Sequence, residues 1–206
     1  MVKISDAVQK SCDILKNKVT NPRLEAELIT AHVLQKDRIY VTVHKDNMVK
    51  SEDEEKIILN SEQRAAGMPF AYITGKKEFM SLDFCVDSNV LIPRPETEEL
   101  VSLIIDLFKK QTIKLLDLCT GSGAIAISCA KYMPYSVCNG VDISEEAINI
   151  AKHNAENLDV KNQTDFWKYD VLSSNWNYGI YDVVVSNPPY IETSVIDTLD
   201  KTVKAY

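Results

Sequence analysis

The second half of the chain repeats one pattern, in which an apolar strand is followed by a turn and then by a helix. Strands are expected at 114–119, 136–142, 163–169 and 181–186. Helices are expected at 124–132 and 144–158, the second capped by Ser144. Strands that alternate with helices imply right-handed β-α-β units and a parallel sheet. The sequence therefore predicts an α/β protein.

The first 68 residues show helical periodicity instead. One helix is expected at 4–17. A second begins with Asn21 as N-cap and Pro22 as its first position. A third begins with a capping-box pattern at Ser51 and ends at Gly67. The stretch 38–44 fits either a short strand or a last helical turn. The sequence thus predicts a small N-terminal helical bundle over residues 1–68.

Short aromatic and β-branched runs follow the bundle, at residues 69–92. They predict a linking β-hairpin, with Gly75-Lys76 as turn residues. Pro95 and the acidic residues after it then start a helix. Residues 93–206 are expected to form the α/β domain, whose sheet would be incomplete on its C-terminal side. After the fourth strand only one helix, near 195–204, is expected.

Composition and charge narrow the class of protein. The formal net charge of −7 and the pI of about 5.0 argue against a protein that grips a phosphate backbone, so no direct nucleic-acid partner is expected. Five scattered cysteines without metal-ligand spacing indicate reduced thiols in the cytoplasm and no metal site. We expect neither a leader nor a membrane-spanning segment.

A glycine turn and two aspartates indicate a bound cofactor. Thr120-Gly-Ser-Gly123 follows the first strand, and Asp142 ends the second, where an acid commonly binds ribose hydroxyls. A third glycine of the dinucleotide pattern is missing, and Asp117 before the turn would repel a pyrophosphate. A cationic cofactor fits better, and S-adenosylmethionine carries an ammonium and a sulfonium group. This favours a methyltransferase over an NAD enzyme.

A stiff loop, Asn187-Pro-Pro-Tyr190, follows the fourth strand. Pro188 and Pro189 fix their φ angles and lack N–H groups, so the loop offers mainly carbonyl oxygens, an amide and an aromatic ring. Such a loop suits a planar group that bears an NH₂. The alternative is a plain strand-terminating turn, with Tyr190 in core packing. Asp170, after the third strand, either reaches an adenine amino group or caps its own loop.

These motifs together resemble a known family. Asp117-Leu-Cys-Thr-Gly-Ser-Gly-Ala-Ile-Ala126 with Asp142 and Asn187-Pro-Pro-Tyr190 is similar to class I, Rossmann-like S-adenosylmethionine-dependent methyltransferases that modify amide or exocyclic amino nitrogens. The segments 64–75, 78–79 and 90–98 resemble the peptide chain release factor glutamine methyltransferases (the PrmC/HemK family). The match runs from about residue 60 to Ile191, and the helical N-terminal domain agrees with it.

The resemblance implies roles for individual residues. It implies that the cofactor site comprises Cys119, Thr120, Gly121, Ser122, Gly123, Asp142, Asp170, Val171 and Asn187. Thr120 to Gly123 would line the methionine end, Asp142 the ribose and Val171 the adenine. The substrate glutamine would lie against Asn187, Pro188, Pro189 and Tyr190, of which Asn187, Pro188 and Tyr190 are catalytic. The broader pattern has glycine at Cys119, and cysteine is small enough to replace it if the φ there is negative, as we expect.

The resemblance also implies the reaction. A methyl group would pass from S-adenosylmethionine to the side-chain amide of the glutamine in the GGQ motif of class I release factors, leaving S-adenosylhomocysteine. Asn187 and the Pro188 carbonyl would accept the two amide N–H bonds. Alternatives are a DNA adenine methyltransferase, a ribosomal-protein glutamine methyltransferase, and an inactive or binding fragment because of the missing C-terminal strands. The sequence leaves the oligomeric state and the roles of Arg94 and Glu96 open.

Overall fold

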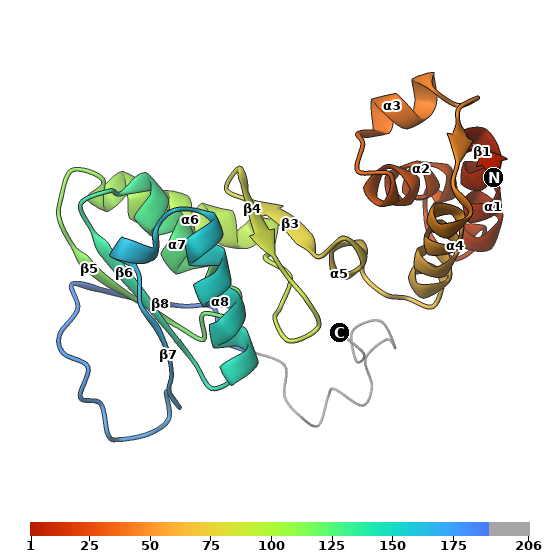
Figure 1. Cartoon of the computed structure of the whole chain (residues 1–206). Coiled ribbons are helices and arrows are strands. Elements are labelled where there is room, and N and C mark those ends of the chain that lie inside the picture. Colours follow the sequence, from red (N-terminus) through yellow and green to blue (C-terminus); the bar gives the residue numbers. More distant parts are fainter. Residues whose placement is uncertain (190–206) are drawn as a thin grey trace. The chain divides into compact units, whose positions relative to one another are not determined.

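The computed structural model describes residues 1–189 of the 206-residue chain (Figure 1). These residues divide into two compact units, one formed by Met1–Thr74 and one that begins at Gly75. Tyr190 and the helix expected near residues 195–204 lie outside the described residues. Among the described residues, no helix has the length and apolar character needed to cross a membrane.

The first unit is a helical bundle closed by a short antiparallel pair of strands. Its core gathers apolar side chains of α1, α2 and α4, with Leu15, Ile29 and Ile57 fully buried. The elements are β1 (Val2–Lys3), α1 (Ile4–Leu15), α2 (Pro22–Val33), α3 (Arg38–Val43), β2 (Met48–Val49), α4 (Ser51–Ala65) and α5 (Phe70–Thr74).

Two helix starts in this unit differ from the expected capping. Asn21 and Pro22 occupy the expected N-cap and first positions of α2, but the Asn21 side chain makes no capping hydrogen bond. The capping box predicted at Ser51 is wrong, because Lys50 is the N-cap and Ser51 is already helical. The stretch 38–44 forms a helix, since the Asp37 side chain accepts a hydrogen bond from the Tyr40 N–H and fixes its start.

The predicted linking hairpin exists, but its turn was placed wrongly. Residues Phe70–Thr74 form the helix α5, and the hairpin pairs β3 (Lys76–Phe79) with β4 (Leu82–Cys85). The turn consists of Met80 and Ser81, both with left-handed φ angles, of +52° and +57°. Two left-handed residues suit the twist of a two-residue hairpin turn. Neither residue is a glycine or asparagine, so the local turn rules pointed to Gly75 instead.

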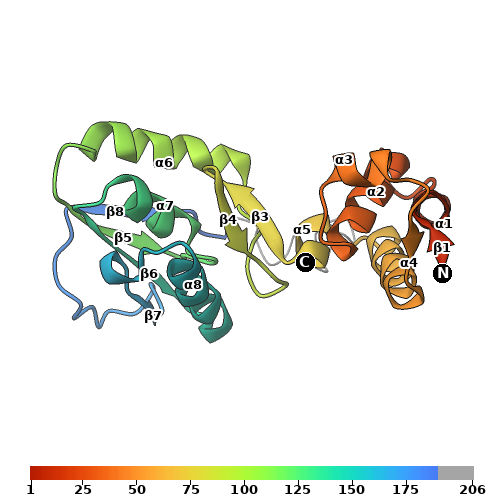
Figure 2. The same ribbon diagram turned by 45° about the horizontal axis from the view of Figure 1, so that its top comes forward.

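The second unit contains the predicted parallel sheet. The strand order is β7-β6-β5-β8, and all three neighbouring pairs are parallel. Figure 2 shows β8 beside β5. The elements are α6 (Pro95–Phe108), β5 (Lys114–Leu118), α7 (Ala124–Tyr132), β6 (Val137–Asp142), α8 (Glu145–Asn157), the 3₁₀ turn η1 (Lys161–Gln163), β7 (Phe166–Lys168) and β8 (Val183–Ser186).

One face of this sheet is covered by helices. Leu115, Cys138, Phe166 and Val185 lie on that face and share a core with side chains of α6, α7 and α8. Ser144 caps α8 as predicted, accepting the N–H of Ala147. On the opposite face an aromatic cluster surrounds the segment between β7 and β8. Its members are Trp167, Tyr169, Trp176, Tyr178 and Tyr181.

Candidate functional site

The predicted site residues of the second unit follow the carboxyl ends of the four parallel strands. The glycine turn follows β5, Asp142 ends β6, Asp170 comes after β7, and Asn187 comes directly after β8. Because the strands are parallel and adjacent, these ends lie along one edge of the sheet. Ligands of open α/β sheets bind at that edge.

Gly123 closes the glycine turn and starts α7. Its φ of +80° is left-handed, and it is the N-cap of the helix. A Cβ atom at this position would lie 2.7 Å from Ile127 Cδ1 and 3.1 Å from Ala151 Cβ. Glycine is therefore required here both by backbone conformation and by the close approach of α7 and α8. Gly123 serves the packing of the turn.

Gly121 differs, because open space lies above it. Its φ is +55°, and a Cβ atom would meet no other atom within 4 Å. The Gly121 N–H donates to Asp142 Oδ2 at 2.9 Å, which ties the turn to the end of β6. The turn thus presents bare backbone toward open space, as close approach of a ligand requires.

Asp142 is half-buried and organised by backbone groups. Besides Gly121, its other oxygen, Oδ1, accepts the N–H of Ser144 at 3.1 Å. A carboxylate offers about four acceptor sites on its two oxygens. Each oxygen therefore keeps capacity to accept a hydrogen bond from a ligand hydroxyl, as ribose recognition requires.

Asp117 lies beneath the glycine turn and has no exposed surface. Its Oδ2 accepts from the Thr120 hydroxyl at 2.6 Å, while Oδ1 has no hydrogen-bond partner among the described residues. Burial raises the pKa of this carboxyl from 3.8 to about 7, the Thr120 hydrogen bond opposes the rise, and the charge of Asp142 adds to it. Asp117 thus supports the turn from below instead of facing a ligand directly.

Cys119 has a left-handed backbone, with φ of +59°. This contradicts the expected negative φ. A left-handed conformation costs a non-glycine residue roughly 1–2 kcal/mol, so the cysteine introduces strain where the broader pattern has glycine. Burial raises the pKa of the half-buried thiol, and the charge of Asp142 raises it further.

Asp170 caps its own loop. Its Oδ1 accepts the N–H of Leu172 at 2.9 Å, and its backbone carbonyl accepts the N–H of Ser173. Two roles were considered for Asp170, contact with an adenine amino group and capping of its own loop. Its contacts among the described residues match loop capping. The neighbouring Val171 is 38% exposed, which leaves an apolar side chain at this end of β7.

The loop after β8 contributes Asn187. The Asn187 Nδ2 donates to Thr97 Oγ1 at 3.3 Å, which connects the loop to the first turn of α6. Asn187 is half-buried, whereas Pro188 and Pro189 are exposed. Just before them, the Ser186 hydroxyl donates to the Leu118 carbonyl at 2.9 Å. Tyr190 is not among the described residues.

Two contact residues were missed by sequence reasoning. Thr97 lies in the first turn of α6 and offers no local signal of its contact with Asn187. Asn154 lies on the buried face of α8, where an amide among apolar residues was a signal. Its side chain accepts the Cys85 N–H at 2.7 Å and donates to the carbonyls of Cys85 and Ser122. Asn154 therefore links β4 to the glycine turn.

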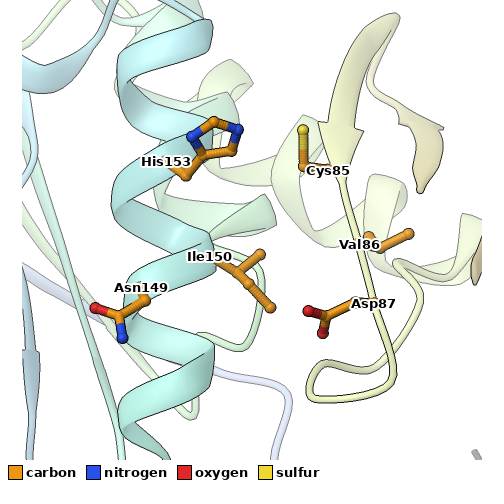
Figure 3. A pocket seen from close by; sticks show the side chains of 6 residues that line it. All are labelled: Cys85, Val86, Asp87, Asn149, Ile150 and His153. Atoms are coloured by element: carbon orange, nitrogen blue, oxygen red, sulfur yellow. The ribbon is translucent and has the colours of Figure 1, made fainter.

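A separate hollow of about 280 Å³ lies between α8 and the segment that follows β4. In Figure 3, Ile150 and His153 extend from α8 toward Cys85 and Asp87. The ring of His153 is hydrogen-bonded to the Asn157 side chain at 2.9 Å. None of the residues at the carboxyl ends of β5, β6, β7 and β8 lines this hollow, so it is distinct from the candidate site.

Comparison with known proteins agrees with the fold. Residues 97–204 match the Methyltransferase small domain family, and residues 6–75 match the PrmC N-terminal domain family. The parallel sheet, the glycine turn and this match define a Rossmann-like class I methyltransferase domain.

The whole chain has close relatives. It is 41% identical over 186 residues to the release factor glutamine methyltransferase of Buchnera aphidicola, covering 89% of this chain and 66% of the relative. It is 37% identical over 210 residues to that of Clostridium acetobutylicum, covering 100% and 73%. The chain belongs to the release factor glutamine methyltransferase family, and it spans about two thirds of the length of these relatives.

A structural comparison gives a partial match. The tRNA (uracil-54, C5)-methyltransferase of Pyrococcus abyssi, solved with S-adenosyl-L-homocysteine, aligns with a TM-score of 0.46 and 21% identity. The alignment covers 59% of this chain and 30% of that protein.

Proposed function

We propose that the chain methylates the side-chain amide nitrogen of the glutamine in the GGQ motif of class I release factors, with S-adenosylmethionine as methyl donor. Membership in the family supports this substrate over adenine in DNA and over ribosomal proteins. The observation that carries the proposal is the edge of the sheet, where Gly121 and Asp142 lie on neighbouring strand ends and Asn187 follows the adjacent strand.

The residues present fit the donor. The open space above Gly121 admits a ligand against the backbone, and Asp142 keeps acceptor capacity for two ribose hydroxyls. The turn Thr120 to Gly123 would hold the methionine end, and Val171 would supply an apolar contact for adenine. When bound, S-adenosylmethionine supplies a methyl group on a cationic sulfur.

The chain's own residues prepare the amide. An amide nitrogen is a weak nucleophile because its lone pair is delocalised into the carbonyl. Asn187 Oδ1 and the Pro188 carbonyl would accept its two N–H bonds, which fixes the amide plane and raises the electron density on nitrogen. Tyr190 would lie against that plane. The amide nitrogen, held by Asn187 and Pro188, would accept the methyl group and release one proton to water.

The first unit would recognise the release factor. Its helices form a core independent of the second unit, and the family match at residues 6–75 covers it. A separate recognition domain suits a protein substrate, because one glutamine side chain offers little surface for discrimination.

The proposal is tested with two variants of opposite type. Asn187→Ala should lower the turnover of a GGQ-containing release factor at least a hundredfold, while calorimetry shows that most of the binding of S-adenosylhomocysteine is retained. Asp142→Ala should instead raise the dissociation constant of that ligand at least tenfold. Turnover is measured by transfer of a labelled methyl group.

Asn162→Ala is the matched control, since Asn162 is exposed in η1, which precedes the amino end of β7, whereas the candidate site follows the carboxyl ends of the strands. Near-normal turnover of Asn187→Ala would reject the role of Asn187. A wild-type chain that binds the ligand but methylates no release factor would reject the proposed function itself.

A further inference from the structure

The contact between Asn187 and Thr97 joins two segments that are 90 residues apart. Thr97 is half-buried and its hydroxyl oxygen is 3.3 Å from Asn187 Nδ2. With Nδ2 directed to Thr97, the other end of the carboxamide, Oδ1, is left to accept a hydrogen bond. This is the atom that the proposed function assigns to the substrate amide.

The loop has few means of fixing Asn187 by itself. Pro188 and Pro189 have no N–H groups and are exposed, so they donate no hydrogen bond that would anchor the loop. Among the described residues 187–189, the contact with Thr97 is the one side-chain hydrogen bond found. The orientation of the Asn187 carboxamide therefore depends on a residue outside the loop.

Thr97 itself is held firmly. Its N–H donates to the Arg94 carbonyl in the first turn of α6. The next residue, Glu98, accepts the Met80 N–H at 2.8 Å, and the Tyr132 hydroxyl donates to the Met80 carbonyl at 2.5 Å. The hairpin turn, α6 and α7 thus fix the backbone that carries the Thr97 hydroxyl.

We propose that Thr97 is a positioning residue, whose hydroxyl holds the Asn187 carboxamide so that Oδ1 faces the substrate amide. The proposal rests on the proposed function. Without the hydroxyl, the Asn187 NH₂ loses its partner and the carboxamide is free to rotate. A rotated carboxamide would present N–H groups to the N–H groups of the glutamine, which lowers the fraction of productive complexes.

The kinetic test compares two substitutions of one side chain. Thr97→Val keeps the shape but removes the hydroxyl, and it should lower kcat about five- to tenfold, as loss of one neutral hydrogen bond predicts. The affinity for S-adenosylhomocysteine should not change. Thr97→Ser keeps the hydroxyl and should stay within about twofold of wild type.

Thr164→Val is the control for the loss of a threonine hydroxyl elsewhere in the same unit, since the Thr164 hydroxyl donates to the Val160 carbonyl next to η1. Equal turnover of Thr97→Val and wild type would overturn the proposal. Equal losses in Thr97→Val and Thr97→Ser would also overturn it, because the hydroxyl would then not be the cause.

A second measurement needs no turnover. In the ¹⁵N-labelled chain, the side-chain NH₂ signals of Asn187 are assigned by their loss in Asn187→Ala. They should move in Thr97→Val and keep their positions in Thr97→Ser and Thr164→Val. If the Asn187 signals do not move in Thr97→Val, the contact is overturned. If they do move but the wild-type chain transfers no methyl group, only the proposed function is rejected.

Discussion

The two halves of the candidate site are built differently. The cofactor half, made of the glycine turn and Asp142, is tied from several sides, because Asp142 accepts two backbone N–H groups and Asn154 holds the Ser122 carbonyl. The substrate half, Asn187 to Pro189, has one side-chain hydrogen bond, to Thr97. We infer that the first half is preorganised and that the second depends on its surroundings.

Under the proposed function, the difference follows from what each half must do. A small, constant ligand is bound best by groups that need no rearrangement, and buried polar networks with satisfied partners supply that rigidity. A glutamine that arrives on another protein must enter and leave at every turnover. An exposed loop whose prolines restrict its backbone leaves room for such a substrate. The contact with Thr97 then fixes the orientation of the Asn187 carboxamide.

The largest effect on stability is expected at Gly123, the glycine that packs the cofactor half of the site. Gly123→Ala combines a left-handed backbone with a Cβ only 2.7 Å from Ile127, so it should lower the free energy of unfolding by roughly 3 kcal/mol. Gly121→Ala has the same backbone cost without the clash and should lose only about 1 kcal/mol. Urea denaturation measures both.

The pair also separates packing from binding. Gly121→Ala should weaken S-adenosylhomocysteine at least tenfold, because the new methyl group enters the open space above the turn. If Gly121→Ala binds the ligand normally, this space is not the ligand site. If both glycine variants lose equal stability, the distinction between the two glycines is wrong.

A smaller effect concerns the buried carboxyl of Asp117. Its pKa of about 7 in the folded chain lies above the ordinary value of 3.8, so between these values the folded state binds more protons than the unfolded state. The contribution of Asp117 to stability is therefore present below about pH 4 and is lost as the pH rises to about 7. The slope is roughly 1 kcal/mol per pH unit.

The measurement is urea denaturation from pH 4 to 8, with Asp117→Asn as reference. The neutral amide should remove the contribution of Asp117 to the pH dependence of the free energy of unfolding. The variant should therefore gain stability relative to wild type as the pH rises. A constant difference between the two proteins across this range would show that Asp117 does not titrate there.

The smallest effect on stability is expected from a substitution that relieves backbone strain at Cys119, next to the glycine turn. Cys119→Gly removes the cost of a left-handed φ and should raise the free energy of unfolding by about 1 kcal/mol. Cys138→Ala is the contrasting variant, since Cys138 is fully buried in β6 and its truncation should destabilise. If Cys119→Gly is less stable than wild type, the left-handed φ of Cys119 does not cost stability as predicted.

The parallel sheet was predictable because its signals are local. Each strand is a short apolar run, and the helices begin with caps or prolines, as Ser144 and Pro95 show. The third strand proved shorter than predicted, with a 3₁₀ turn at Lys161–Gln163 before it. The strand ends then place the glycine turn and Asp142 without any knowledge of the packing.

The failures occurred where distant contacts or backbone strain decide. The hairpin turn uses left-handed Met80 and Ser81, and Met80 is held by hydrogen bonds with Glu98 and Tyr132. Cys119 has a left-handed φ although it is not a glycine, next to a turn in which Gly121 and Gly123 are also left-handed. The contact of Thr97 with Asn187 spans 90 residues, so no local pattern contains it.

The order of the strands has a consequence for how the chain folds. Strands β5, β6 and β7 follow one another along the chain, whereas β8 pairs with β5 across 68 residues, from Leu115 to Val183. Pairings between distant residues require the closure of a long loop and form slowly. We expect β8, which Asn187 directly follows, to join the sheet last. The glycine turn would then be assembled before the substrate loop reaches its place, and hydrogen-exchange labelling during refolding would show β8 protected after β5 and β6.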